Sequence, residues 1–172
     1  MRKAIFTAIA DALCPANPAD PKADTSKNIV PYVDLWNDQV NLLGGGTAFE
    51  VPAVFVEFEQ IDWKQQNVGA RRGDIPVRLH IVTRAVPTHG FHDPRMAEAL
   101  AVFDLINTIN AKMQGLRGEG FAGFQITTSA TNHNHAELVE NVERLITSAQ
   151  DCTGMRKMPH VVGLSAAITS NK

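Results

Sequence analysis

Four histidines stand in two short pairs that could ligate a metal ion. His89 and His92 lie in "THGFHD", and His133 and His135 lie in "NHNH". Zinc takes three or four imidazole, thiolate or carboxylate ligands in tetrahedral geometry. His133 and His135 have strand spacing and would face the same side, but the two pairs could share an ion only if their loops met in space. "NHNH" is also typical of a turn, because Asn tolerates left-handed backbone. We favour the turn, and a small metal-dependent enzyme that uses these four histidines is the alternative.

The other patterns that could carry chemistry are weaker. "GEGFAG", residues 118–123, matches the G-x-G-x-x-G of dinucleotide-binding proteins, but a helix is expected before it and a strand after it, which inverts the required order. Cys14 and Cys152 have no zinc-binding spacing. No triad can be read from spacing, because such partners meet only in the fold. We therefore expect no enzyme, no catalytic residue and no cofactor.

Two carboxylates, Glu57 and Glu59, fall on one face of an expected strand. Two like charges at that distance can raise a pKa for acid–base work. They can equally form a solvated face or pair with a cation such as Arg78 on the next strand. We favour the solvated or paired interpretation.

Composition sets the class of protein. The 172 residues are 44% hydrophobic and 20% charged, which is ordinary for a globular chain with a real core, and we expect a single domain over residues 1–172. The net charge of −2 provides no bulk attraction to nucleic acid. The start, "MRKAIFTAIADALC", superficially resembles a signal peptide, but Asp11 interrupts its apolar run. No window is long enough for a membrane span, and an intracellular, reduced setting fits the cysteines.

The first half of the chain predicts one helix and a group of strands. Residues 2–13 place Ile5, Ile9 and Leu13 on one helical face, with Ala8 and Ala12 beside them. The Pro-rich residues 14–31 predict an extended loop. Strands are expected in "IVPYVDLWNDQV", "VPAVFVEFEQIDW" and "GDIPVRLHIVTRA", the last two paired as a hairpin whose long basic tip contains "VGARRG".

The second half predicts a long helix over residues 93–115. Asp93 suits the cap, Pro94 suits the first helical position and Gly115 suits the end. "FAGFQITTSAT" then predicts a strand. Residues 136–150 fit a helix by their 3.6-residue period, although a twisted strand is also permitted. The tail after residue 152 has few charges beyond Lys157 and either runs along the domain or reaches a neighbouring subunit. The apolar stripe expected on the long helix is Met96, Leu100, Phe103, Ile106 and Met113.

The segment "VPAVFVEFEQIDWKQQNVGARRGDIPVRLHIVTR" resembles the tail-completion and tail-terminator proteins of long-tailed bacteriophages and prophages. The order of elements over residues 2–151 is similar as well. The resemblance implies an α+β fold, a mostly antiparallel sheet with helices packed on one face. It implies a homohexameric ring at the head-proximal end of the tail tube, which ends tube polymerisation and joins the tail to the head connector. The implied partners are copies of the chain itself, the tail tube protein and the connector or neck protein, with no membrane and no sequence-specific nucleic acid.

The resemblance also bears on location and on the ambiguous segment. Its members act in the virion, at the tail or neck, after assembly in the host cytoplasm, and no catalytic residue or cofactor comes with them. The counterpart of residues 136–150 is a strand paired with the preceding one, so we predict a strand there against the local periodicity. "NHNH" would then join two antiparallel strands. The Pro-rich loop at 14–31 and the C-terminal extension at 152–172 depart from the family pattern.

Four residues are our candidates for the contact with a neighbouring subunit or partner. Flat aromatic and cationic side chains usually anchor such contacts, and a ring repeats one head-to-tail interface on every subunit. A monomeric binding module shares these features and differs in its oligomeric state. The candidates are Trp36, Trp63, Arg71 and Arg72.

Overall fold

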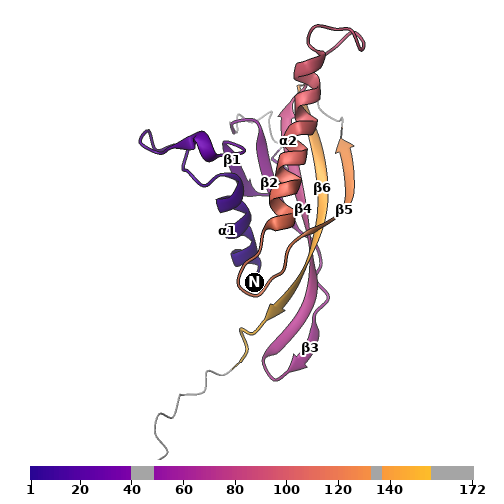
Figure 1. Ribbon diagram of the computed structural model, residues 1–172. Coiled ribbons are helices and arrows are strands. Elements are labelled where there is room, and N and C mark those ends of the chain that lie inside the picture. Colours follow the sequence, from indigo (N-terminus) through magenta and orange to yellow (C-terminus); the bar gives the residue numbers. More distant parts are fainter. Residues whose placement is uncertain (40–48, 133–136, 156–172) are drawn as a thin grey trace, which may run out of the picture.

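The computed structural model describes residues 1–39, 49–132 and 137–155. A six-stranded sheet has the order β1-β2-β4-β6-β5, with β3 paired to one end of β4 (Figure 1). β1 and β2 are parallel, and the other pairs are antiparallel. The expected α+β class with a mostly antiparallel sheet is confirmed. The elements are α1 (Arg2–Leu13), a 3-10 turn (Thr25–Lys27), β1 (Tyr32–Leu35), β2 (Ala53–Phe58), β3 (Lys64–Asn67), β4 (Ala70–Arg84), α2 (Met96–Gly115), β5 (Gln125–Asn132) and β6 (Leu138–Asp151).

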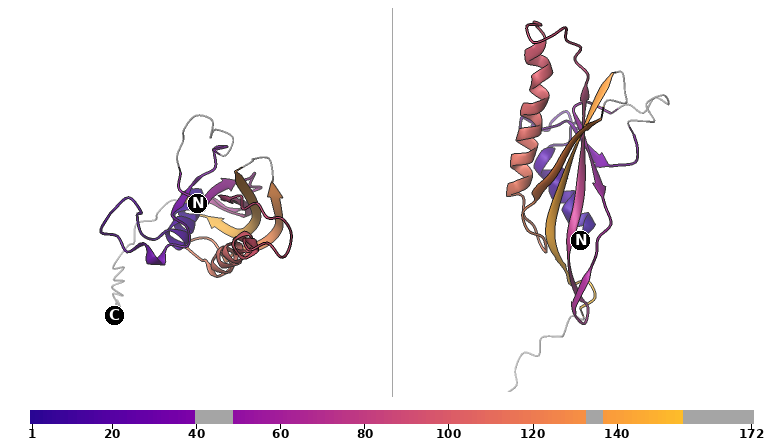
Figure 2. Two further views of the ribbon diagram at one scale, coloured as in Figure 1. Left: turned by 90° about the horizontal axis from the view of Figure 1, so that it is seen from above. Right: turned by 90° about the vertical axis from the view of Figure 1, so that its right-hand side faces the viewer.

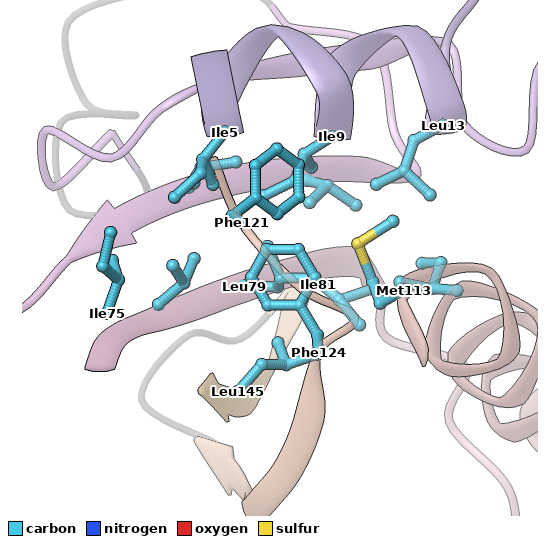
Figure 3. Packing of buried hydrophobic residues seen from close by; sticks show 14 of the residues in the cluster. Ile5, Ile9, Leu13, Ile75, Leu79, Ile81, Met113, Phe121, Phe124 and Leu145 are labelled. Atoms are coloured by element: carbon cyan, nitrogen blue, oxygen red, sulfur yellow. The ribbon is translucent and has the colours of Figure 1, made fainter. Parts of the chain in front are cut away.

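Both helices cover the same face of the sheet, as expected (Figure 2). α1 buries Ile5, Ile9 and Leu13, which confirms its predicted apolar face. Alternate residues of β4 meet them from the sheet, because successive strand side chains point to opposite faces. This layer forms the main core (Figure 3), which includes Ile75, Val77, Leu79, Ile81, Ile109, Met113, Phe121, Phe124 and Leu145.

β6 confirms the strand expected from the resemblance. It pairs with β4 along its whole length, from Leu138 opposite Arg84 to Asp151 opposite Arg71. It also pairs with β5 on its other side. A central strand draws its stability from two ladders and from side-chain burial, and these override a local 3.6-residue period.

The expected antiparallel pairing of the two strands is confirmed, since β2 pairs with β4, but the expected basic loop at the tip is wrong. β4 begins at Ala70, so Arg71 and Arg72 belong to the strand, and the turn after β3 is made by Val68 and Gly69. Because consecutive strand residues alternate, the two arginines point to opposite faces of the sheet. Arg71 shares the helix-covered side with Ile75, whereas Arg72 lies on the helix-free side.

The apolar stripe expected on α2 is also partly wrong. The buried side chains are Ile106, Ile109 and Met113, whereas Leu100 and Phe103 are 46% and 55% exposed. The helix begins at Met96, and the Asp93 carboxylate accepts the backbone N–H groups of His89 and Arg95 at 2.8 Å each in the turn before it. The helix is rotated relative to the expected stripe, because the side that packs on the core carries Val102, Leu105, Ile106, Ile109 and Met113.

The Pro-rich loop folds back on the end of α1 instead of extending. The Asn28 side chain accepts the Ala16 N–H and donates to the Ala16 carbonyl, both at 2.9 Å. The backbone N–H of Ile29 donates to the Leu13 carbonyl at 2.8 Å. In the part of the chain that the structure describes, no helix is long and apolar enough to cross a membrane.

Candidate interaction surface

The helix-free face of the sheet carries a ladder of ionisable side chains across three strands. β2, β4 and β6 each place alternate residues on this face, so side chains far apart in the sequence meet across the ladders. The members of this polar ladder are Glu57, Glu59, Arg78, His80, Glu140 and Arg144.

His80 is the centre of the polar ladder and is 6% exposed. Its Nδ1 lies 2.6 Å from Glu140 Oε1, and its Nε2 lies 3.1 Å from Glu57 Oε2. The Trp36 ring stacks on the imidazole with 3.8 Å between centroids and 2° between planes. The imidazole therefore joins one glutamate from β2 to another from β6, 83 residues apart in the sequence.

Glu59 joins the two arginines of the polar ladder. Arg144 Nη2 lies 2.8 Å and Arg78 Nε 2.6 Å from its oxygens, and Arg78 also reaches Glu57 at 3.4 Å. The hydrogen bond from Arg144 lowers the pKa of Glu59, against the opposing effect of burial, and the same bond raises the pKa of Arg144. The paired interpretation of Glu57 and Glu59 is therefore confirmed, with Arg78 as one of the partners.

A hollow of about 440 Å³ lies over the polar ladder, lined by Trp36, His80, Thr128 and Arg144 among others. Charged, hydroxyl and aromatic side chains together form its walls. Because the ladder groups already bond one another, their hydrogen-bonding capacity is largely met within the chain. The surface is therefore suited to contact through its shape and through the Trp36 ring.

A second patch, the hairpin-end patch, lies where β3 and β4 leave the body of the fold (Figure 1). The Arg71 guanidinium lies 4.6 Å above the Trp63 ring and donates to Asp151 at 2.9 Å. Hydrogen bonds from the Thr153 hydroxyl and then from Arg71 hold the pKa of Asp151 well below its usual range. Gly69 completes the patch, since its backbone touches that of Gly154.

The four candidate contact residues do not form one surface. Trp63 and Arg71 meet in the hairpin-end patch. Arg72 lies on the other face, where its guanidinium donates to the Ser148 hydroxyl at 3.2 and 3.3 Å. Trp36 belongs with His80. Both tryptophans are partly buried, whereas both arginines are exposed.

The structure does not bring His89 and His92 into a metal site. The His89 backbone bonds Asp93, and the His92 ring meets the Phe91 ring edge-on with 5.3 Å between centroids. Among the described residues no group of three or more His, Cys, Asp or Glu side chains could hold a metal ion. His133 and His135 lie outside the described residues. They fall between β5 and β6, which are antiparallel neighbours as expected.

His80 was missed as a functional candidate although it stands in the clearest strand pattern of the chain. Its partners are 23 and 60 residues away in the sequence. The sequence offered one indication of its role. Arg78 and His80 are two residues apart and so share a strand face, as do Glu57 and Glu59 on the neighbouring strand. That signal identifies the cation on the neighbouring strand but not Glu140, which required β6 to be a strand.

Comparison with known proteins finds a distant structural likeness. No known family model matches the chain, and no curated protein matches its sequence. A chain in the solved structure titled "Virion of native gene transfer agent (GTA) particle" is similar with a TM-score of 0.49 and 13% identity, over 87% of this chain and 96% of that chain. A likeness this distant carries no statement about activity, partners or position in a particle.

Proposed function

We propose that this chain is a structural assembly protein of the tail-terminator kind. Copies of it would close a ring, in the proposal a hexamer, on the head-proximal end of a phage-like tail tube. The ring would end tube polymerisation and present a docking surface to the head connector. In this proposal residues 1–172 act as one unit in the virion, after assembly in the host cytoplasm.

The observation that carries the proposal is β6. The local sequence favours a helix over residues 136–150, and only the resemblance to tail-terminator proteins required a strand there. β6 is a strand over Leu138–Asp151, paired with β4 on one side and β5 on the other. The resemblance therefore anticipated a long-range feature that the local period does not favour, which supports the function that comes with it.

The helix-free face supports the same proposal. Among the described residues both helices lie on the other face of the sheet, and on this side Trp36 lies flat against His80 of the polar ladder. Its charged groups are engaged with one another over 2.6 to 3.4 Å. Groups held this way fix a surface shape, which suits assembly better than proton transfer.

Electron microscopy of the intact particle, or of the protein mixed with its tail tube, tests the proposal directly. The expected result is a six-fold ring of this chain at the head-proximal end of the tube. If the tube ends normally without the protein at its end, the proposal is wrong.

Arg72→Glu provides a residue-level test of docking. Arg72 is exposed and bonds a neutral hydroxyl, so its reversal breaks none of the ion pairs recorded among the described residues. We expect weaker ring closure or partner docking with unchanged thermal stability. Arg95→Glu is the matched control, because it makes the same charge change at the N-terminal end of α2 and removes one exposed pair with Glu98, which contributes little. Equal docking by both variants would remove Arg72 from the interface.

A further inference from the structure

An apolar groove opens at the end of the molecule opposite the β3–β4 hairpin. It has a volume of about 370 Å³ and lies between the first half of α2 and the ends of β2, β4 and β6 that face it. Its apolar side chains are half-buried, apart from the exposed Ala101, so the core does not fill the groove. Thr83 and the exposed Arg84 and Glu98 also line it. The apolar residues that line it include Val86, Ala99, Val102, Leu105 and Val139.

The sequence after Met155 has the composition that such a groove would bind. Residues 158–171 contain no Asp, Glu, Lys or Arg, and include Val161, Val162, Leu164 and Ile168. Burial of apolar side chains of this size removes a large apolar area from water and is favourable. A run of this kind is expected to be covered by an apolar surface rather than to stay in water.

The root of this C-terminal arm, which we define as residues 156–172, is held at the hairpin end of the molecule. Asp151 Oδ1 accepts the Thr153 N–H at 3.0 Å, and Asp151 also pairs with Arg71 at 2.9 Å. Gly154 packs backbone to backbone against Gly69, where a Cβ would lie 2.2 Å from the Gly154 carbonyl. The chain therefore leaves the fold from a fixed point beside the β3–β4 turn.

Distance separates this root from the groove of the same chain. The groove contacts Val139 near the start of β6, and the root follows Asp151 at its end. Twelve residues of strand span roughly 40 Å. Six residues from Met155 to Val161 span at most about 20 Å, even fully extended. The first apolar residues of the arm cannot reach their own groove, whereas a neighbouring copy has no such limit.

We infer that the C-terminal arm of one copy docks in the apolar groove beside α2 of a second copy. The partner thus completes a site that is open in the single chain. The inference deepens the proposed function and rests on it for its biological setting, since arm exchange would link neighbouring subunits of an assembly. The chemistry is the burial of aliphatic side chains, so the contact depends weakly on salt.

Disulfide trapping between two labelled populations tests the inference on the purified full-length chain. One population carries Leu164→Cys with natural isotopes, and the other carries Ala101→Cys with nitrogen-15, both with Cys14→Ser and Cys152→Ser. Ala101 is exposed and lines the groove. Apolar docking of this size is expected to bind in the micromolar to millimolar range, so the mixture is oxidised at about 0.5 mM. Mass spectrometry then counts mixed dimers.

Ala111→Cys is the matched control for the groove position. It is also exposed on α2 but lies towards the other end of the helix and does not line the groove. We expect mixed dimers to be about tenfold more abundant with Ala101→Cys than with Ala111→Cys, which corresponds to about 1.4 kcal/mol of preference. Equal yields would overturn the inference.

A chain that carries both Leu164→Cys and Ala101→Cys separates the two possible paths of the arm. A monomer closed by an internal disulfide, with no excess of dimers, would overturn the inference. Neither experiment contains a tail tube or connector. Trapping can therefore fail while microscopy finds a ring, or succeed while it finds none, so the two proposals fail separately.

Discussion

The imidazole of His80 lies flat against the indole of Trp36, with 3.8 Å between ring centroids and 2° between ring planes. The same imidazole bridges Glu140 at 2.6 Å and Glu57 at 3.1 Å. Glu140 is itself 5% exposed and is also reached by the Asn132 amide at 2.9 Å. These contacts connect β2, β4, β5, β6 and the residue that directly follows β1, so we expect the stability of the helix-free face to depend on His80.

Replacing Glu140 tests this dependence. Glu140→Leu leaves a buried ring nitrogen of His80 without its hydrogen-bond partner, and we expect the free energy of unfolding to fall by about 3 kcal/mol. Replacing both members of a buried polar pair is less costly than replacing one. The double variant His80→Leu/Glu140→Leu should therefore lose less than the sum of the two single variants, by about 1–3 kcal/mol. Urea unfolding measures all three.

Glu98→Leu is the control for this cycle. Glu98 pairs with Arg95 at 3.1 Å on the surface of α2, where both side chains are about half exposed or more. Exposed pairs of this kind contribute about 0–1 kcal/mol. If Glu140→Leu were no more destabilising than Glu98→Leu, the buried bridge would not stabilise the fold.

The sequence predicts local features of this fold better than the contacts between its strands. α1 follows from the spacing of Ile5, Ile9 and Leu13, which needs no information from elsewhere in the chain. The bridge at His80 depends on residues brought together by two strand pairings. β6 could be predicted only from the resemblance, because the pairing with β4 outweighs its helical period.

The orientation of α2 provides a second example and a prediction. The expected stripe through Leu100 and Phe103 had good helical spacing, but the helix offers more than one apolar side and the sheet selects between them. We expect Ile109→Ala to lower the free energy of unfolding by about 2–4 kcal/mol, because Ile109 is fully buried. Phe103→Ala should change it by less than about 0.5 kcal/mol, because that side chain is 55% exposed.

Chemical unfolding of the two variants side by side checks the orientation. Both substitutions introduce alanine, the best helix former, into the same helix. Helix propensity therefore does not explain a difference in stability between the two variants. A loss at Phe103 as large as that at Ile109 would mean that Phe103 is covered in solution.

The lowered pKa of Asp151 predicts how stability changes in acid. A carboxyl whose pKa is lower in the folded state binds fewer protons there than in the unfolded chain. Its contribution to the free energy of unfolding is therefore present at neutral pH and is lost as pH falls below about 4. Glu59 changes stability in the same direction. We expect Asp151→Asn to lower the free energy of unfolding at pH 7 by about 2 kcal/mol. The deficit relative to wild type should shrink progressively from pH 5 to pH 2.

Thermal unfolding midpoints across this pH range provide the test. Asp11→Asn, at an exposed position of α1, is the control for general acid effects. A deficit of Asp151→Asn that stays constant from pH 7 to pH 2 would show that the carboxylate charge is not the source of the stabilisation.

Gly69 and Gly90 separate backbone strain from steric conflict. Both have positive φ, +83° at Gly69 and +117° at Gly90. A Cβ at Gly90 meets nothing within 4 Å, whereas one at Gly69 would lie 2.2 Å from the Gly154 backbone. Gly90→Ala should therefore cost only the strain of the left-handed backbone, about 1–2 kcal/mol.

Gly69→Ala adds a clash that only movement of the backbone can relieve, so we expect a larger loss of stability and faster proteolysis after Asp151. Equal losses for the two variants would mean that residues 152–155 do not pack on the β3–β4 turn, and the fixed root of the C-terminal arm would be lost with that contact.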